Sequence, residues 1–313
     1  MKILVVGLGA LGTVFSCFLQ KNGHNVSAVD TQEMVQKVQN KVVKVCGIWG
    51  KHSAQLKNIV SSPNELKNDF DLVILTVKSF HTEKALENLK GILKDKTRII
   101  LAQNGFGNYE KAQAYVKKEN IIVSRIIFGA ETINPGYSKV TVIADDVLIG
   151  SPENLIPLKE LGNIANIINM SGIPCRASNE IMKFVWEKII YNSALNSLGA
   201  ILEVNYGKLA EMEDTQKIMN KIIEEIFNVL EAMGEKISWP NSEAYLEDFY
   251  SKLVPVTANH HASMLQDIQL GRHTEIDALN GAICSLGKKY NISTPVNWII
   301  TKLVKAKEKL VQK

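Results

Sequence analysis

Three glycines between a short apolar run and a helical pattern constrain the fold of this chain more than any other feature. The run is Ile3–Val6, and a continuous apolar run of this kind is typical of a parallel strand that is buried on both faces. The next residues are Gly7, Leu8, Gly9, Ala10, Leu11 and Gly12. Apolar residues then recur at helical spacing, and a second apolar run, Val26–Val29, ends at Asp30. This order predicts a βαβ unit with the glycines in the turn between strand and helix.

The rest of the chain divides into an α/β part and a helical part. Asp71–Val77 and Thr97–Ala102 are further apolar runs with a helical stretch between them, and strands separated by turns follow up to Ser151. Only helical patterns remain after Ser178. A length of 313 residues also favours two domains. We therefore predict an α/β domain with a parallel sheet over residues 1–178 and an all-α domain over residues 179–313.

The composition excludes several classes of protein. A hydrophobic share of 46% and a charged share of 22% are typical of an ordinary globular chain, and a net charge of +4 is too small for a dedicated nucleic-acid binder. The four cysteines lie far apart without a CxxC pair, as expected for reduced thiols in a cytosolic protein. Glycines interrupt the uncharged stretch Ile3–Gln20, so we expect neither a signal peptide nor a membrane span.

The glycine turn has the chemistry of a dinucleotide site. In such a turn Gly7 permits the sharp bend, Gly9 lets the backbone approach a pyrophosphate, and Gly12 lets the helix pack on the strand. The helix N-terminus then faces the phosphates. The alternative is a glycine-rich turn that only packs a helix on a sheet.

Asp30 indicates which nicotinamide dinucleotide is bound. A carboxylate at the end of the second strand accepts hydrogen bonds from the ribose hydroxyls and repels a 2′-phosphate. The next basic residue is Lys37, so the residues favour NADH over NADPH. The alternative is that Asp30 only caps the helix that follows it.

Two further polar segments follow the later apolar runs. Lys78 comes directly after the first of these runs, and Gln103, Asn104 and Gly105 come after the second. Ligands bind at the carboxyl ends of strands in open α/β sheets, so we expect these residues to line a nicotinamide pocket. Taken separately, each could be ordinary loop chemistry, because Asn-Gly is a common turn.

Polar residues form one stripe on an otherwise apolar helix of the second half. Lys188, Asn192 and Asn196 recur every four residues, which places them on one helical face. A solvated face would usually include acidic residues among them, and a lysine in apolar surroundings needs a partner. We expect this stripe to hold a small polar anion.

The stretch from Ser263 to Gly281 is polar but keeps apolar residues at a helical period. The simplest interpretation is a salt bridge between Asp267 and Arg272 together with helix caps. The nearby histidines lack the spacing of a metal-binding helix, so we expect no metal site. We interpret the lysine-rich C-terminus as the solvated face of a last helix: Lys302, Lys305, Lys307, Lys309 and Lys313.

With these residues in place, the chain resembles the ketopantoate reductase (2-dehydropantoate 2-reductase) family over essentially its whole length. The shared motifs are the glycine turn, VK at 77–78, QNG at 103–105, the polar stripe, SMLQD at 263–267 and GRHTEID at 271–277. The resemblance implies a Rossmann-like N-terminal domain that binds NAD(P)H and a helical C-terminal domain that binds a small 2-keto acid. The implied reaction is the reduction of ketopantoate to pantoate for coenzyme A biosynthesis.

The resemblance also implies a role for each site residue. Lys188 would be the general acid, with Glu275 as a second catalytic residue on the cofactor side. The substrate would be held by Asn104, Lys188, Asn192, Asn196 and Ser263. The cofactor would be held by Gly7, Leu8, Gly9, Ala10, Leu11, Gly12, Asp30, Lys78, Asn104 and Glu275.

The chain departs from the family pattern in three places. Asp30 and Thr31 stand where the family typically has an arginine for NADPH, so the residues favour NADH against the family default. His260 and Tyr206 stand where the family often has asparagines on the substrate side, which leaves the identity of the keto acid open.

Two alternatives therefore stay beside ketopantoate reduction. One is an NAD-dependent D-2-hydroxyacid dehydrogenase of the same family that acts on branched or bulky 2-keto acids. The other is a non-enzymatic dinucleotide sensor, which the intact set of Lys188, both asparagines and Glu275 argues against, because a sensor needs no proton donor. For partners we expect a small 2-keto acid, no nucleic acid and no membrane, with a homodimer as one option for the assembly.

Overall fold

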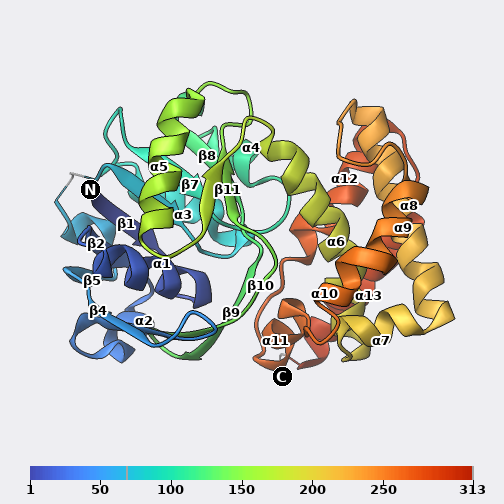
Figure 1. The fold of residues 1–313 in the computed structure, drawn as a ribbon, viewed down its shortest axis with the longest axis horizontal. Coiled ribbons are helices and arrows are strands. Elements are labelled where there is room, and N and C mark those ends of the chain that lie inside the picture. The colour runs from blue at the N-terminus through green and yellow to red at the C-terminus, as the bar shows by residue number, and fades with distance from the viewer. Residues whose placement is uncertain (68–69, 312–313) are drawn as a thin grey trace. The chain divides into compact units, whose positions relative to one another are not determined.

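The chain divides after residue 182 into an α/β unit and a helical unit, except for one loop. The α/β unit contains residues 1–103 and 108–182, and the helical unit contains residues 104–107 and 183–313. The computed structural model describes residues 1–67 and 70–311, and Figure 1 shows their elements. The loop 104–107 directly follows a strand of the α/β unit, so its grouping with the helices is a tertiary feature.

A mixed, largely parallel sheet forms the centre of the α/β unit. Its described strands are β1 (Lys2–Val6), β2 (Asn25–Val29), β5 (Asn58–Val60), β6 (Leu72–Leu75), β7 (Arg98–Leu101), β8 (Ile121–Arg125), β11 (Val147–Gly150) and β12 (Cys175–Ala177). They are ordered β12-β11-β8-β7-β6-β1-β2-β5. Strand β1 pairs in parallel with β2 on one side and β6 on the other, while β11 runs antiparallel to β8. The predicted parallel sheet is confirmed, and the carboxyl ends of β1, β2, β6 and β7 meet at one edge.

Helices pack against this sheet through apolar side chains. Helices α1 (Ala10–Lys21) and α5 (Leu158–Met170) lie on one face of it (Figure 1). Phe15 of α1 and Ile164 of α5 share one core cluster with Ile3 and Val5, which are alternate residues of β1. The other helices of this unit are α2 (Gln32–Lys37), α3 (Thr82–Leu89) and α4 (Asn108–Ala112).

A smaller second sheet contains two strands that the sequence patterns did not predict. Its order is β4-β3-β10-β9, with β3 at Val42–Gly47, β4 at His52–Gln55, β9 at Phe128–Asn134 and β10 at Tyr137–Ile143. Strand β3 pairs in parallel with β10, although the two are far apart in the chain. Trp49 after β3 packs against Phe18 of α1 and Phe128 of β9, with ring centroids 5.6 and 4.9 Å away. The exposed residues that alternate along β3 hide it from a search for apolar runs.

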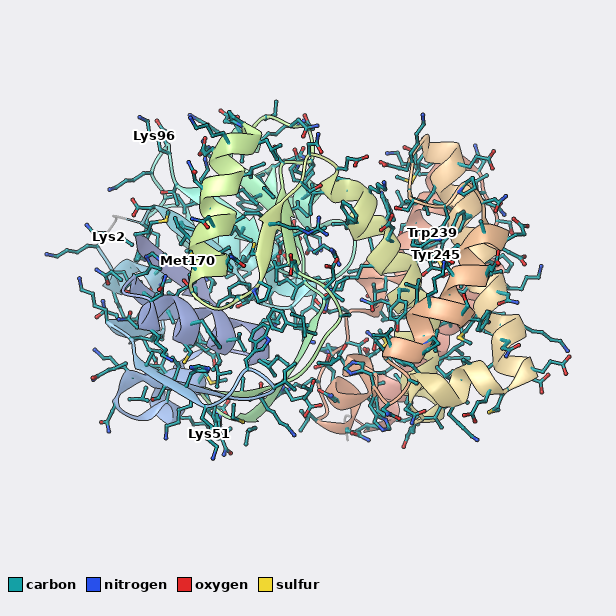
Figure 2. The ribbon with its side chains drawn as sticks, in the orientation of Figure 1. Lys2, Lys51, Lys96, Met170, Trp239 and Tyr245 are labelled. Carbon is teal, nitrogen blue, oxygen red and sulfur yellow. The ribbon has the colours of Figure 1, made fainter. Side chains whose placement is uncertain are left out.

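The helical unit is built around α6 (Ile181–Leu202), which has buried apolar residues over most of its length. Its core also includes residues of α8 (Glu213–Met233), α12 (Asn280–Tyr290) and α13 (Pro295–Val311). Shorter helices complete the unit: α7 (Tyr206–Glu211), α9 (Ser242–Asp248), α10 (Val254–Val256) and α11 (Ser263–Gln269). Trp239 and Tyr245, which are labelled in Figure 2, pack edge to face with ring centroids 4.8 Å apart. This contact anchors the segment that joins α8 to α9.

The C-terminal lysines differ from the prediction of a solvated face. The Lys307 side chain is only 21% exposed, and its Nζ donates hydrogen bonds to the carbonyl oxygens of Ala200 and Ile201 at 2.8 and 2.9 Å. The prediction is therefore wrong for Lys307, which satisfies carbonyl groups at the C-terminus of α6. Lys313 lies outside the described residues.

The four cysteines carry free thiols. Burial raises the pKa of Cys17 to about 11 and that of Cys175 to about 12, so both thiols are protonated at neutral pH. Among the described helices, none is both long and apolar enough to cross a bilayer.

The close packing of α1 on β1 generates a stability prediction. A Cβ atom on Gly12 would lie 1.7 Å from the Gly7 carbonyl oxygen, whereas a Cβ on Gly9 would meet nothing within 4 Å. We expect Gly12→Ala to lower the free energy of unfolding by about 3 kcal/mol, the upper end of overpacking costs. The control Gly9→Ala should change it by no more than about 1 kcal/mol, because it only replaces an N-cap glycine. Urea unfolding followed by circular dichroism measures both, and equal stabilities would show that α1 can move away from the strand.

Candidate active site

The glycine turn is tied to the ends of two strands. Gly7 has a φ of +98°, which favours glycine, and its N–H donates to the Val29 carbonyl of β2 at 2.8 Å. The Thr76 hydroxyl, which follows β6, donates to the Gly7 carbonyl at 2.7 Å. Sequence reasoning missed Thr76, whose only signal was its place at the end of an apolar run. These bonds hold the turn at the carboxyl edge of the sheet.

The turn fits a pyrophosphate group. Gly9 occupies the N-cap of α1, has open space around it, and leaves the first turn of the helix without an acidic residue. The helix N-terminus carries a partial positive charge and N–H groups that point outward. A negatively charged phosphate can therefore approach the backbone at Gly9 without meeting a side chain of Gly9 or an acidic residue in the first turn of α1.

Asp30 turns toward the glycine turn rather than toward the helix that follows it. Its Oδ2 accepts a hydrogen bond from the N–H of Leu8, and its Oδ1 accepts one from the N–H of Thr31 at 2.6 Å. The hydroxyl of Thr31 caps α2 by accepting from Met34 N–H at 3.3 Å. The side-chain cap of α2 is thus Thr31 and not Asp30.

The basic residue nearest to Asp30 in the following sequence is already paired. Lys37 forms an ion pair with Glu33 one helical turn earlier, and both side chains are exposed. The Lys37 ammonium is therefore engaged by Glu33 rather than by Asp30.

Lys78 and Gln103 follow the neighbouring parallel strands β6 and β7, as the sequence predicted. Lys78 is half-buried and stands at the N-cap of a short 3₁₀ turn, 79–81. Gln103 donates to the Thr82 hydroxyl at 2.8 Å, and that hydroxyl also bonds the Asn108 side chain. Gln103 therefore stabilises the segment that follows β7 by bonding it to Thr82.

In the helical unit, Lys188, Asn104 and Glu275 form one chain of hydrogen bonds. The Lys188 ammonium donates to Asn104 Oδ1 at 2.7 Å, and Asn104 Nδ2 donates to Glu275 Oε2 at 3.2 Å. Lys188 is half-buried on α6, and Glu275 is 9% exposed. A cation is thereby held in place beside a buried carboxylate through one neutral amide.

The loop that carries Asn104 is seated on the residues after Glu275. Phe106 N–H donates to the Ala278 carbonyl at 2.8 Å, and the Phe106 ring stacks on Trp186 of α6 with centroids 4.8 Å apart. Gly105 has a φ of +84°, and a Cβ there would lie 2.3 Å from the Ala278 oxygen. The glycine of the predicted Asn-Gly turn is required because only a residue without Cβ lets the two backbones approach this closely.

Asn196 and Asn192 lie on the same helix but differ in their bonding. Asn196, which is 5% exposed, accepts from Met264 N–H at 3.1 Å and donates to the Ser263 hydroxyl at 3.2 Å. It therefore supports the N-terminus of α11. The half-buried Asn192 side chain makes no hydrogen bond to any part of the chain that the structure describes.

The two other unusual positions are packed against each other. Tyr206 is 3% exposed, and its ring lies edge to face with those of Tyr191 and His260 at centroid distances of 6.1 and 5.3 Å. Burial raises the pKa of Tyr191 to about 12 and that of Tyr206 further still. The neighbouring Asn205 caps α7 by accepting from Lys208 N–H at 2.9 Å. Tyr206 is thus a core side chain of this unit.

The segment after α11 returns to the helix through a backbone hydrogen bond. Arg272 and Asp267 are joined through the backbone, because Arg272 N–H donates to the Asp267 carbonyl at 2.8 Å. Within residues 1–67 and 70–311, no group of three or more His, Cys, Asp or Glu side chains is placed to hold a metal ion.

Comparison with known proteins identifies relatives over the whole chain. The family model described as ketopantoate reductase PanE/ApbA matches residues 3–154, and the model of its C-terminal part matches residues 180–308. The 2-dehydropantoate 2-reductase of Aquifex aeolicus (strain VF5) is 46% identical over 308 residues, which are 98% of this chain and 97% of that protein. The 2-dehydropantoate 2-reductase of Lactococcus lactis subsp. lactis (strain IL1403) is 29% identical and covers 100% of this chain and 99% of its own length.

Two solved structures are similar over 100% of both chains. D-mandelate dehydrogenase with NADH and anilino(oxo)acetate matches with a TM-score of 0.88 and 28% identity. A PanE/ApbA family ketopantoate reductase from Ralstonia eutropha JMP134 matches with a TM-score of 0.88 and 25% identity.

The contrast between the two asparagines can be tested by stability. Asn196→Ala would leave the buried Met264 N–H without its acceptor, so we expect it to lower the free energy of unfolding by about 1–3 kcal/mol. The matched control Asn192→Ala, one helical turn away, should change it by less than about 0.5 kcal/mol. Thermal or urea unfolding of both variants provides the comparison. An equal loss of stability in the two variants would contradict a stabilising role of the bond from Met264 N–H to Asn196.

Proposed function

Because the chain belongs to the ketopantoate reductase family, we propose that it reduces the 2-keto group of ketopantoate to give pantoate. The family relationship makes the protein an oxidoreductase that uses a nicotinamide cofactor and a small keto acid. The observation that supports the specific reaction is the hydrogen-bonded chain of Lys188, Asn104 and Glu275. We assign cofactor binding to residues 1–178 and substrate binding to residues 179–313, together with Asn104. The homodimer and the cytosolic location stay predictions of the sequence.

In this proposal Lys188 is the general acid. A nicotinamide held by the glycine turn would supply a hydride for the keto carbon, so the keto oxygen would need a group that offsets its negative charge. An ammonium group can neutralise that charge by donating a proton, which contributes typically 10²–10⁴-fold to the rate. Asn104 holds the Lys188 ammonium through Oδ1, so the donor is already oriented when the substrate binds.

Glu275 and the polar stripe are given supporting roles. The Glu275 carboxylate accepts from Asn104 and so fixes the amide orientation that presents Oδ1 to the lysine. Asn192, whose side chain is uncommitted within the described structure, would bind the substrate directly together with Ser263. Asn196 would position Ser263, to whose hydroxyl it donates.

We propose NADH as the preferred cofactor. Asp30 lies against the glycine turn, where a carboxylate can accept hydrogen bonds from the ribose hydroxyls, and Thr31 supplies no cation for a 2′-phosphate. Gly7, Leu8, Gly9, Ala10, Leu11 and Gly12 would hold the pyrophosphate, and Lys78 would lie toward the nicotinamide end.

The likeness to D-mandelate dehydrogenase with NADH supports a second candidate. The protein would then be an NAD-dependent D-2-hydroxyacid dehydrogenase that acts on branched or bulky 2-keto acids. The two candidates differ in which keto acid has the higher kcat/KM. A panel that contains ketopantoate, phenylglyoxylate and branched 2-keto acids, assayed with both cofactors, distinguishes them.

The role of Lys188 can be tested by substitution. Lys188→Ala should lower kcat for ketopantoate by about 10²–10⁴-fold, because the proton donor is lost. The dissociation constant of the cofactor, measured by quenching of its fluorescence, should barely change. Lys183→Ala removes another lysine of the same helix and serves as the control. A Lys188→Ala enzyme with near wild-type kcat would remove Lys188 from the mechanism.

The cofactor preference has its own test. A 2′-phosphate about 4 Å from the Asp30 carboxylate costs roughly 1–4 kcal/mol for effective dielectrics between water and a protein surface. This corresponds to about one to three decades in affinity. We expect a higher kcat/KM with NADH than with NADPH, and a reversed order in the variant with Asp30→Ala and Thr31→Arg. Steady-state kinetics of the unmodified enzyme with both cofactors decide the matter, since a clear preference for NADPH would contradict the assigned role of Asp30.

A further inference from the structure

A buried carboxylate on the last helix is bonded to the backbone next to Glu275. Glu308 of α13 is 7% exposed, and its Oε1 accepts the N–H of Thr274 at 2.8 Å. Thr274 directly precedes Glu275 and is itself buried. A buried carboxylate needs hydrogen-bond partners, so this bond selects one position for the backbone before Glu275.

The backbone before Glu275 is irregular and depends on tertiary bonds for its position. Residues 272–274 belong to neither a helix nor a strand, and a 3₁₀ turn begins only at Ile276. The Thr274 hydroxyl then accepts the N–H of Ile276 at 3.3 Å, which links the residue held by Glu308 to the start of that turn. Buried polar groups of an irregular segment are satisfied by partners from elsewhere in the fold. For Thr274 that partner is Glu308.

The same helix also holds two other parts of this region. Lys305 pairs with Asp277, two residues after Glu275, at 2.6 Å. Lys307 donates to the carbonyls of Ala200 and Ile201, at the C-terminus of the helix that carries Lys188. Helix α13 therefore contacts both the turn that carries Glu275 and the helix that carries Lys188.

We propose that Glu308 is a positioning residue for the reaction. It holds the Thr274 backbone so that Glu275 stays within hydrogen-bond distance of Asn104, which in turn orients Lys188. The kinetic part of this inference rests on the proposed function. The bond from Asn104 to Glu275 is 3.2 Å long, so a small displacement of Glu275 would take it beyond hydrogen-bond range.

Two substitutions distinguish the effect of the side-chain length of Glu308 from the effect of its charge. Glu308→Asp keeps the charge but is one methylene too short to reach Thr274, and we expect kcat to fall by about 10–100-fold, as for a displacement of about 1 Å. Glu308→Gln keeps the reach and an acceptor oxygen, so its kcat should stay within about threefold of wild type. A full loss in Glu308→Gln together with an unaffected Glu308→Asp would show that charge matters and would overturn the proposal.

A matched control separates positioning from stability. Val304 is fully buried on the same helix, one turn before Glu308. Val304→Ala should lower Tm as Glu308→Asp does, yet leave kcat unchanged when each variant is assayed at the same interval below its own Tm. An equal fall of kcat in both variants would mean that Glu308 acts only through the stability of the fold.

A double-mutant cycle tests whether Glu308 acts through Glu275. If it does, Glu308→Asp should change kcat by no more than about threefold once Glu275→Ala is present, because the group to be positioned is gone. Multiplicative losses in the double variant would overturn the proposal.

Hydrogen–deuterium exchange supplies a measurement that does not depend on turnover. We expect peptides within residues 270–279 to exchange about tenfold faster in Glu308→Asp and at the wild-type rate in Val304→Ala. Unchanged exchange in Glu308→Asp would overturn the positioning role. Absence of turnover in the wild type with every keto acid and both cofactors would instead overturn the proposed function, and the exchange result would still decide the role of Glu308.

Discussion

The side-chain amide of Asn104 is the group on which the candidate site depends. A lysine ammonium only donates hydrogen bonds and a carboxylate only accepts them, whereas an amide does both from two different atoms. Asn104 can therefore serve Lys188 and Glu275 together in a single orientation, with Oδ1 toward the lysine and Nδ2 toward the carboxylate. Aspartate in its place would offer the carboxylate no donor. This orientation depends on the position of the loop 104–107, in which Phe106 bonds the Ala278 carbonyl and stacks on Trp186.

A buried polar network bonds the backbone of α6 at Ser193 and connects this helix to three others of the helical unit. Asn280 donates to the carbonyl of Ser193 and to the side chain of Asn297, and Asn297 donates to the buried carboxylate of Glu225. Glu225 also accepts the N–H groups of Val296 and Asn297 at the start of α13. A carboxylate at a helix N-terminus is favoured by the charge of the helix end. The network joins α6, α8, α12 and α13, so the helix that carries Lys188 and the helix that carries Glu308 share one set of buried bonds.

In the α/β unit, the backbone N–H groups between β1 and α1 have to remain accessible to a ligand. Gly9 contributes no side chain, and the hydrogen bond from the Gly7 N–H to Val29 of β2 fixes the turn at the edge of the sheet. The Asp30 carboxylate contacts the turn through the Leu8 N–H. The turn after β1 thus offers N–H groups for a phosphate, and Asp30 after β2 offers a carboxylate for a ribose. The two groups lie close together because β1 and β2 are neighbouring parallel strands.

Features that depend on neighbouring residues could be predicted from the amino-acid sequence. The turn from Gly7 to Gly12, the parallel strands and the stripe of Lys188, Asn192 and Asn196 follow from local periodicity, because side-chain direction repeats within a few residues of a strand or helix. Contacts between distant groups could not be predicted in this way, because they depend on the tertiary fold. Asn104 bonds residues 84 and 171 positions away, and β3 pairs with β10 through an alternating pattern that no apolar run marks. Lys307 looked like a surface lysine because its partners, two backbone carbonyls and the Glu203 carboxylate, lie more than 100 positions away in the chain. The physical reason is the same in each case: a hydrogen bond requires contact within about 3.5 Å, and sequence spacing controls contact only within one element.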